Sequence, residues 1–160
     1  MTPAVDQLNA LAIPHRVLGY PHDPASAGYG TEAAVALRLD PDSVFKTLLA
    51  QLSGTSAGGS LVVALVPVSK KLDLKALARA AGAKKAEMAP PALAERTTGY
   101  VVGGISPFGQ RKKLATYVDE TVELLDAVHV SAGRRGLEIS LAPDDLIRVL
   151  DASVAPIATA

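Results

Sequence analysis

The chain has 160 residues, of which 49% are hydrophobic, enough for one domain with a substantial core. Its 16 lysine and arginine residues balance 16 aspartate and glutamate residues, so the net charge predicts no general attraction to nucleic acid. Cysteine is absent, which excludes disulfides, a thiolate nucleophile and cysteine metal ligands.

The N-terminal residues lack the basic region and apolar core of a signal peptide. No apolar run approaches the ~18 residues that a membrane span needs. We therefore expect one cytoplasmic domain over residues 1–160, with no membrane as a partner.

The first half of the chain is predicted to contain two capped helices and three strands. Thr2 followed by Pro3 is a favourable helix start and predicts a helix to about Ala12. Thr31 is expected to cap a second helix over residues 32–39, which are rich in alanine and leucine. Mostly apolar runs predict strands over residues 15–20, 42–52 and 61–69. Loops are expected at the Pro- and Gly-rich residues 21–30 and, as a flexible hairpin, at the Gly/Ser-rich residues 53–60.

The second half continues to mix helices and strands. Gly82 is a candidate C-terminal cap, and prolines lie near the starts of two later helices. Helices are predicted over residues 72–82, 91–99 and 143–151, and extended segments over residues 100–104, 115–125 and 127–133. Because strands and helices do not alternate strictly, we expect an α+β fold with a mixed, barrel-like sheet and flanking helices.

One lysine, Lys46, interrupts the apolar run "SVFKTLLA" of Ser43–Ala50. Burying an ammonium group without a partner is costly, so this lysine should be paired, reach solvent, or face a polar cavity. The pattern leaves these three possibilities open.

Several common chemistries have no sequence signal. The three histidines, His15, His22 and His129, are widely spaced and form no metal-binding motif. Only His22, in a loop, is kept as a candidate for the rim of a site. The segment from Gly54 to Ser60 has the glycine spacing of a phosphate-binding loop but lacks its lysine. No nucleophile elbow occurs.

The segment "GYVVGGISPFGQRKK" (residues 99–113) contains a glycine pair, Gly103 and Gly104, that lets a ligand approach the main chain closely. Pro107 fixes a turn and leaves Ser106 with a hydroxyl to donate. Main-chain N–H groups in such a loop can bind an oxyanion or a carbonyl. A plain hairpin turn is the alternative.

Three segments together resemble the YbaK/EbsC family of trans-editing aminoacyl-tRNA deacylases. They are "VFKTL" (44–48), "GYVVGGISPFGQ" (99–110) and "SAGRRGLEISLAPDDL" (131–146). That family is related to the editing domain of bacterial prolyl-tRNA synthetase, and the likeness is to its members that remove cysteine from tRNA(Pro). The resemblance implies no metal and no cofactor, because the thiol of the substrate itself attacks the ester carbonyl.

The resemblance also assigns roles to residues of this chain. It implies that Lys46 is the essential lysine, holding the 3′-terminal phosphate or the carbonyl, and that Tyr20 lies at the pocket rim. It implies a substrate-binding loop made of Gly103, Gly104, Ile105 and Ser106, and a second loop with Ser131 and Gly133. As structural alternatives, Lys46 could end a strand in water, Tyr20 could be a half-buried aromatic residue, and the second loop a simple turn.

One position departs from the family pattern. Many relatives have aspartate where this chain has Glu138. A carboxylate there could contact the substrate amine or orient Lys46, although Glu138 could also be an exposed strand residue.

The expected partners are the 3′ end of tRNA(Pro) and, transiently, prolyl-tRNA synthetase, but not DNA. Basic residues at 111–113 and 134–135 suit RNA contact. Two other functions remain open: deacylation of another small amino acid such as alanine, and binding of an RNA end or aminoacyl ligand without catalysis. The six aromatic residues are few for a protein that binds single strands by stacking.

Overall fold

A computed structural model of the protein describes residues 1–26, 29–55 and 60–160. The centre of the Gly/Ser-rich connector predicted as a flexible hairpin lies outside these residues. The helices are α1 (Pro3–Ala10), α2 (Tyr29–Ala36), α3 (Leu74–Ala81), α4 (Pro91–Thr98) and α5 (Pro143–Leu150), with 3₁₀ turns η1 (Pro41–Ser43) and η2 (Glu120–Leu124). The strands are β1 (Arg16–Gly19), β2 (Phe45–Ser53), β3 (Leu61–Pro67), β4 (Lys71–Leu72), β5 (Lys85–Met88), β6 (Ala115–Asp119), β7 (Val128–Ser131), β8 (Leu137–Leu141), β9 (Ser153–Ala155) and β10 (Ala158–Thr159).

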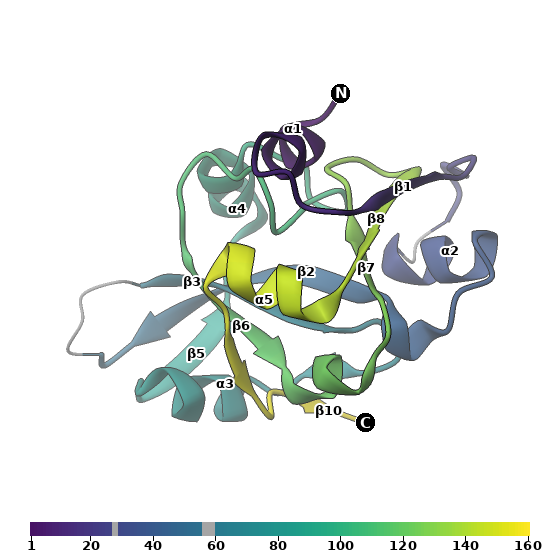
Figure 1. Ribbon diagram of the computed structural model, residues 1–160. Helices are drawn as coiled ribbons and strands as arrows, with labels where there is room; N and C mark the ends of the chain where they lie inside the picture. Colours follow the sequence, from purple (N-terminus) through teal and green to yellow (C-terminus); the bar gives the residue numbers. More distant parts are fainter. Residues whose placement is uncertain (27–28, 56–59) are drawn as a thin grey trace.

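Two main sheets build the domain, and the predicted α+β class with flanking helices is confirmed (Figure 1). The larger sheet has the order β5-β2-β3-β6-β9, with antiparallel pairs around β2 and parallel pairs around β6. The smaller sheet, β1-β8-β7, is antiparallel, and β4 pairs with β10 separately. In the part of the chain that the structure describes, the sheets do not close into a barrel.

Strand β3 is buried on both faces, which explains why it is a continuous apolar run, whereas β2 also contains polar residues and is only partly buried at Lys46 and Thr47. Along β3, Val63 and Leu65 enter a core shared with the smaller sheet, whereas Ala64 and Val66 enter a second core that includes Leu77 of α3. Figure 1 shows α1 and α4 near the N-terminus and α3 near the C-terminus, on opposite sides of this sheet.

Two of the predicted helix ends are confirmed in detail. The Thr2 hydroxyl accepts the Val5 N–H at 3.2 Å, so Thr2 caps α1 as expected. Gly82 ends α3 with a φ of 69°, a left-handed angle that glycine adopts without strain. None of the helices in the described part is long and apolar enough to cross a membrane.

The start of α2 differs from the prediction, because the helix begins at Tyr29 and Thr31 lies inside its first turn. The Glu32 carboxylate accepts the Asp23 N–H at 2.9 Å and lies 2.7 Å from the His22 ring nitrogen Nδ1. The loop is therefore tied to this first turn by Glu32, and Thr31 does not cap the helix.

One predicted extended segment is wrong, and another is confirmed only in its first part. Residues 100–104 form a tight turn in which the Gly104 N–H donates to the Val101 carbonyl at 2.8 Å. The strand predicted over residues 115–125 ends at Asp119, whose carboxylate accepts the Thr121 N–H and hydroxyl and so starts η2.

The same Asp119 side chain fastens a distant part of the chain. It is 3% exposed, and its Oδ1 accepts the N–H groups of Ile157 and Ala158 at 3.0 and 2.9 Å. Charge-assisted hydrogen bonds of this kind are stronger than neutral ones. Asp119 therefore holds residues 157–158 against the end of β6.

We expect Asp119→Ala to lower the free energy of unfolding by about 3 kcal/mol, since buried N–H groups lose a charged acceptor. Urea unfolding would measure this, with the exposed Asp126→Ala as a control that changes stability by less than about 0.5 kcal/mol. Equal stability of the two variants would contradict the role of Asp119.

Candidate active site

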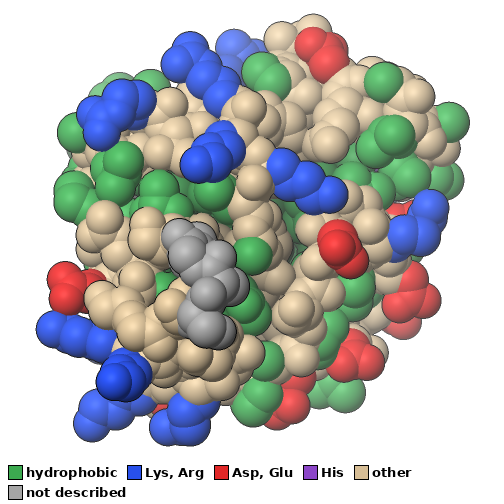
Figure 2. Space-filling view, turned by 90° about the vertical axis from the view of Figure 1, so that its left-hand side faces the viewer, with side chains coloured by type: hydrophobic (Ala, Val, Ile, Leu, Met, Phe, Trp, Pro, Cys, Tyr) green, Lys and Arg blue, Asp and Glu red, His purple; other side chains and the backbone are tan. Residues whose placement is uncertain are grey.

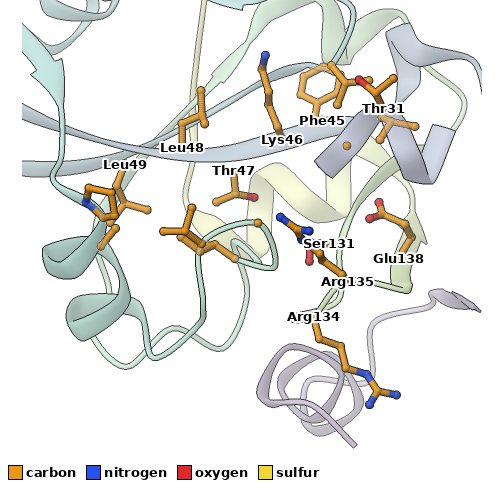
Figure 3. Close-up of a pocket in the computed structure, with 18 of the residues that line it drawn as sticks. Thr31, Phe45, Lys46, Thr47, Leu48, Leu49, Ser131, Arg134, Arg135 and Glu138 are labelled. Atoms are coloured by element: carbon orange, nitrogen blue, oxygen red, sulfur yellow. The ribbon is translucent and has the colours of Figure 1, made fainter. Parts of the chain in front are cut away.

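A cavity of about 570 Å³ lies between β2 and the smaller sheet, bounded also by the start of α2 and the loop after α4 (Figure 3). Most of its lining is apolar, including Leu49, Val102 and Ile105. Its polar lining residues are Tyr20, Thr31, Lys46, Thr47, Ser131, Arg134, Arg135 and Glu138. An apolar cavity with a few polar groups is typical of a small-molecule site.

Strand alternation separates Lys46 from its neighbour Thr47. Phe45 and Leu49 belong to the core between the two sheets, so Thr47 points to that side. Leu48 and Ala50 pack in the second core, so Lys46 points to the other side. Figure 3 shows the two side chains leaving β2 in opposite directions.

Lys46 lies at the edge of the cavity and its ammonium group is paired. Nζ donates to the Lys70 carbonyl at 2.8 Å. Burial lowers the pKa of Lys46, and the positive charge of Lys71 lowers it further. Of the three possibilities that the sequence left open, the structure shows a paired lysine beside a cavity.

Glu138 is buried in the wall formed by β8, with 5% of its surface exposed. Its Oε2 has no hydrogen-bond partner among the described residues. Burial raises the pKa of Glu138 to about 8, so the carboxyl group keeps its proton more readily than an exposed one. The Lys46 ammonium bonds to the Lys70 carbonyl and not to Glu138, which argues against Glu138 orienting the lysine.

Ser131 and Tyr20 also reach the cavity. Ser131 lies opposite Glu138 in the β7–β8 register, and its hydroxyl accepts the Gly133 N–H at 3.1 Å. Tyr20 follows β1 and donates its main-chain N–H to the Gly136 carbonyl at 2.9 Å. Burial is the main cause that raises the pKa of Tyr20. These contacts fix the backbone of both walls.

Three of the expected site residues lie behind the lining. Gly104 packs on the Arg134 backbone, where an added Cβ would lie 2.9 Å from the Arg134 Cα. Ser106 is fully buried, and its Oγ accepts the Phe108 N–H at 3.2 Å. Gly133 has a φ of 113°, and a Cβ there would lie 2.8 Å from the Tyr100 ring. Their positions favour shaping the two loops over direct contact with a ligand.

The other expected residues, Gly103 and Ile105, line the cavity, whereas His22 bonds to Glu32 and does not. Sequence reasoning missed Thr47, although a polar residue next to Lys46 in an apolar strand was a usable signal. Among the described residues, no group of three or more His, Asp or Glu side chains is placed to hold a metal ion.

Glu138→Gln tests the buried carboxyl group. In the wild type, the free energy of unfolding should fall as the pH rises from about 4.5 to about 8, because the unfolded chain loses its proton first. Glutamine does not titrate, so the stability of the variant relative to wild type should increase across this window, by on the order of 4 kcal/mol.

Urea unfolding at several pH values would measure this difference, with the exposed Glu123→Gln as the matched control. A stability difference between Glu138→Gln and wild type that is constant with pH would contradict a raised pKa.

Comparison with known proteins gives the family. Residues 24–149 match the family described as "Aminoacyl-tRNA editing domain". EbsC of Enterococcus faecalis, assigned by inference as a Cys-tRNA(Pro)/Cys-tRNA(Cys) deacylase, is 41% identical over 126 residues, which are 79% of this chain and 74% of EbsC. ProXp-y of Escherichia coli, a multifunctional Ser/Thr-tRNA deacylase, is 30% identical over 105 residues, which are 65% of this chain and 62% of ProXp-y.

The same fold occurs in a crystal structure of a protein assigned by inference as a trans-editing enzyme for prolyl-tRNA synthetase. The two chains are 24% identical, with a TM-score of 0.82 over 98% of this chain and 93% of the other. From the match over residues 24–149, the chain belongs to the aminoacyl-tRNA editing domain family, which confirms the family predicted from its three motifs.

Proposed function

We propose that this protein is a trans-editing deacylase that releases cysteine mischarged on tRNA(Pro), without a metal ion or a protein nucleophile. The observation that carries the proposal is an apolar cavity in an editing-domain chain that is 41% identical to EbsC. A volume of about 570 Å³ is within the usual range of small-molecule sites and suits an aminoacyl group with part of the terminal adenosine.

The reaction that we propose uses the substrate thiol. The cysteine sulfur attacks the ester carbonyl carbon and forms the C–S bond of a thiolactone. The ester C–O bond breaks, and the ribose oxygen leaves with the proton that the thiol gives up. Positioning supplies much of the rate in such an intramolecular step, so the protein needs no nucleophile of its own.

The loop after α4 is the candidate for stabilising the oxyanion. Gly103 and Ile105 line the cavity, and main-chain N–H groups there could contact the developing negative charge. The Gly104 N–H is already used by the Val101 carbonyl. We therefore assign the oxyanion contact to Gly103 or Ile105.

Lys46 would hold the terminal phosphate or the ester carbonyl. An ammonium group carries three N–H donors, and the Lys70 carbonyl takes one of them. Two donors remain for substrate oxygens without breaking that bond. The lowered pKa of Lys46 does not prevent this role as long as the group stays charged at the pH of the reaction.

Exposed basic residues suit the RNA part of the substrate. Arg134 is exposed at the cavity edge, and the exposed Arg111 packs on Gly99 at the start of the loop after α4. Figure 2 shows several Lys and Arg side chains exposed on one face of the molecule. A few such contacts can hold an acceptor end, while a transient complex with prolyl-tRNA synthetase would supply tRNA specificity.

A second candidate is hydrolytic removal of another small amino acid. The similarity to ProXp-y, named as a Ser/Thr-tRNA deacylase, favours this alternative. It would need an attacking water where the first mechanism uses the substrate thiol.

We expect Lys46→Ala to lower the rate of Cys-tRNA(Pro) deacylation at least about 100-fold, because a positive charge beside the reacting group is lost. The exposed Lys75→Ala on α3 should keep the wild-type rate, and a chelator should leave that rate unchanged. Full activity of Lys46→Ala would refute the role of the lysine, and an inactive wild type would refute the cysteine assignment.

The thiol mechanism predicts a large difference between two substrates. On the same tRNA(Pro), serine should be released at least about 100-fold more slowly than cysteine, since a hydroxyl is the weaker nucleophile. Mass spectrometry of the released product should find the thiolactone. Equal rates for the two substrates would favour attack by water.

A further inference from the structure

Thr47 is a polar residue on the inward side of β2. Its neighbours on that side, Phe45 and Leu49, are both buried in the core between the sheets. An apolar residue would satisfy this position in a purely structural strand. Thr47 also lines the cavity.

The Thr47 hydroxyl oxygen is buried and has no hydrogen-bond partner among the described residues. Leaving a buried hydroxyl unpaired costs roughly 1–3 kcal/mol. Because Thr47 lines the cavity, a turn of χ1 to another staggered position can bring the hydroxyl to a bound molecule. A ligand that hydrogen-bonds this hydroxyl would remove the cost.

The main-chain N–H and carbonyl groups of Thr47 lie on the edge of β2 that faces away from β3. The Val44 carbonyl accepts the Val68 N–H, so by alternation the main-chain groups of Thr47 point away from β3. On that other edge, a parallel bridge joins Val44 to His129 before Thr47. Bonding to the β5 side starts after Thr47, where the Leu49 carbonyl accepts the Ala89 N–H. In the described residues, no strand pairs with β2 at Thr47 on the cavity side.

A second unpartnered polar atom lies on the other wall. Glu138 Oε2 has no partner among the described residues, and Glu138 shares a face of the smaller sheet with Ser131. Figure 3 shows Thr47 extending from β2 on the same side as Ser131 and Glu138. Two buried polar atoms without partners, on opposite walls of one apolar cavity, can each receive a polar group of a ligand.

The chemistry of the two groups divides their tasks. A carboxyl group can accept a hydrogen bond from an amine, which suits Glu138 to the substrate's α-amino group. A neutral hydroxyl both donates and accepts, which suits another hydroxyl or a thiol.

We propose that Thr47 is a specificity-determining residue whose hydroxyl bonds to the side-chain heteroatom of the bound amino acid. The cavity would therefore prefer small amino acids with a β-hydroxyl or β-thiol over alanine. This inference rests on the proposed function, because it takes the ligand to be an aminoacyl group.

Binding of stable analogues tests the inference apart from catalysis. The probes are 3′-seryl- and 3′-alanyl-amino-3′-deoxyadenosine, in which an amide replaces the labile ester, measured by calorimetry. Thr47→Val keeps the shape of the side chain and removes the hydroxyl. We expect this substitution to lower the affinity for the seryl analogue about tenfold and the affinity for the alanyl analogue by less than about twofold.

Two further variants control the comparison. Thr47→Ser keeps a hydroxyl and should retain the preference for the seryl analogue. Thr159→Val removes a hydroxyl from an exposed threonine that does not line the cavity and should change neither affinity. Thr47→Val should also melt no lower than wild type, since the hydroxyl it removes has no partner in the protein.

The possible results separate the two proposals. The role of Thr47 would be overturned if Thr47→Val lowered the affinity for both analogues equally or left both affinities unchanged. It would also be overturned if the wild type bound neither analogue. Selective weakening with no deacylation of any aminoacyl-tRNA by wild type would support Thr47 and overturn the proposed activity.

Discussion

The alternation of side chains along β2 places two adjacent residues in opposite surroundings, and the character of the cavity depends on it. Pairing with β3 from Phe45 to Gln51 fixes the register of the strand. A slip of one residue would turn the ammonium of Lys46 into the core and remove Thr47 from the cavity. The apolar residues around them therefore do more than fill space, because they determine which polar group lies between the two sheets and which lies at the edge of the cavity.

The cavity combines an apolar wall with polar groups that the protein leaves unsatisfied. Most buried polar atoms in folded proteins have partners, so the oxygens of Thr47 and Glu138 are exceptions that require an explanation. Binding sites are where such exceptions are expected, since a ligand can supply the missing bonds. The raised pKa of Glu138 is caused by its burial in the same wall.

The sequence predicted those helix ends that are determined by residues next to the end itself. The caps Thr2 and Gly82 were identifiable because each satisfies its own helix end. The end of β6 was not predictable in this way. Asp119 stops the strand through bonds to η2 and to residues 157–158, and the latter contact is visible only in the folded chain.

The short strands β4, β5, β9 and β10 were also missed, since runs of two to four residues carry little periodicity. For the site, motif resemblance found residues on both walls but could not separate those that line the cavity from those that support its loops. Ser106 and Gly133 illustrate the difference, because their roles depend on contacts with Phe108 and Tyr100. Burial and packing direction, which decide that distinction, are tertiary properties.

The attachment of residues 157–158 to Asp119 has a consequence for synthesis of the protein. The larger sheet gains its edge strand β9, and Asp119 gains two of its donors, only from residues 153–158. A chain grows from its N-terminus at roughly 5–20 residues per second, so these contacts become available only some time after β6 itself has been made. Until then, the edge of β6 that binds β9 has no partner strand. The larger sheet is complete only after the ribosome has made residues 153–158.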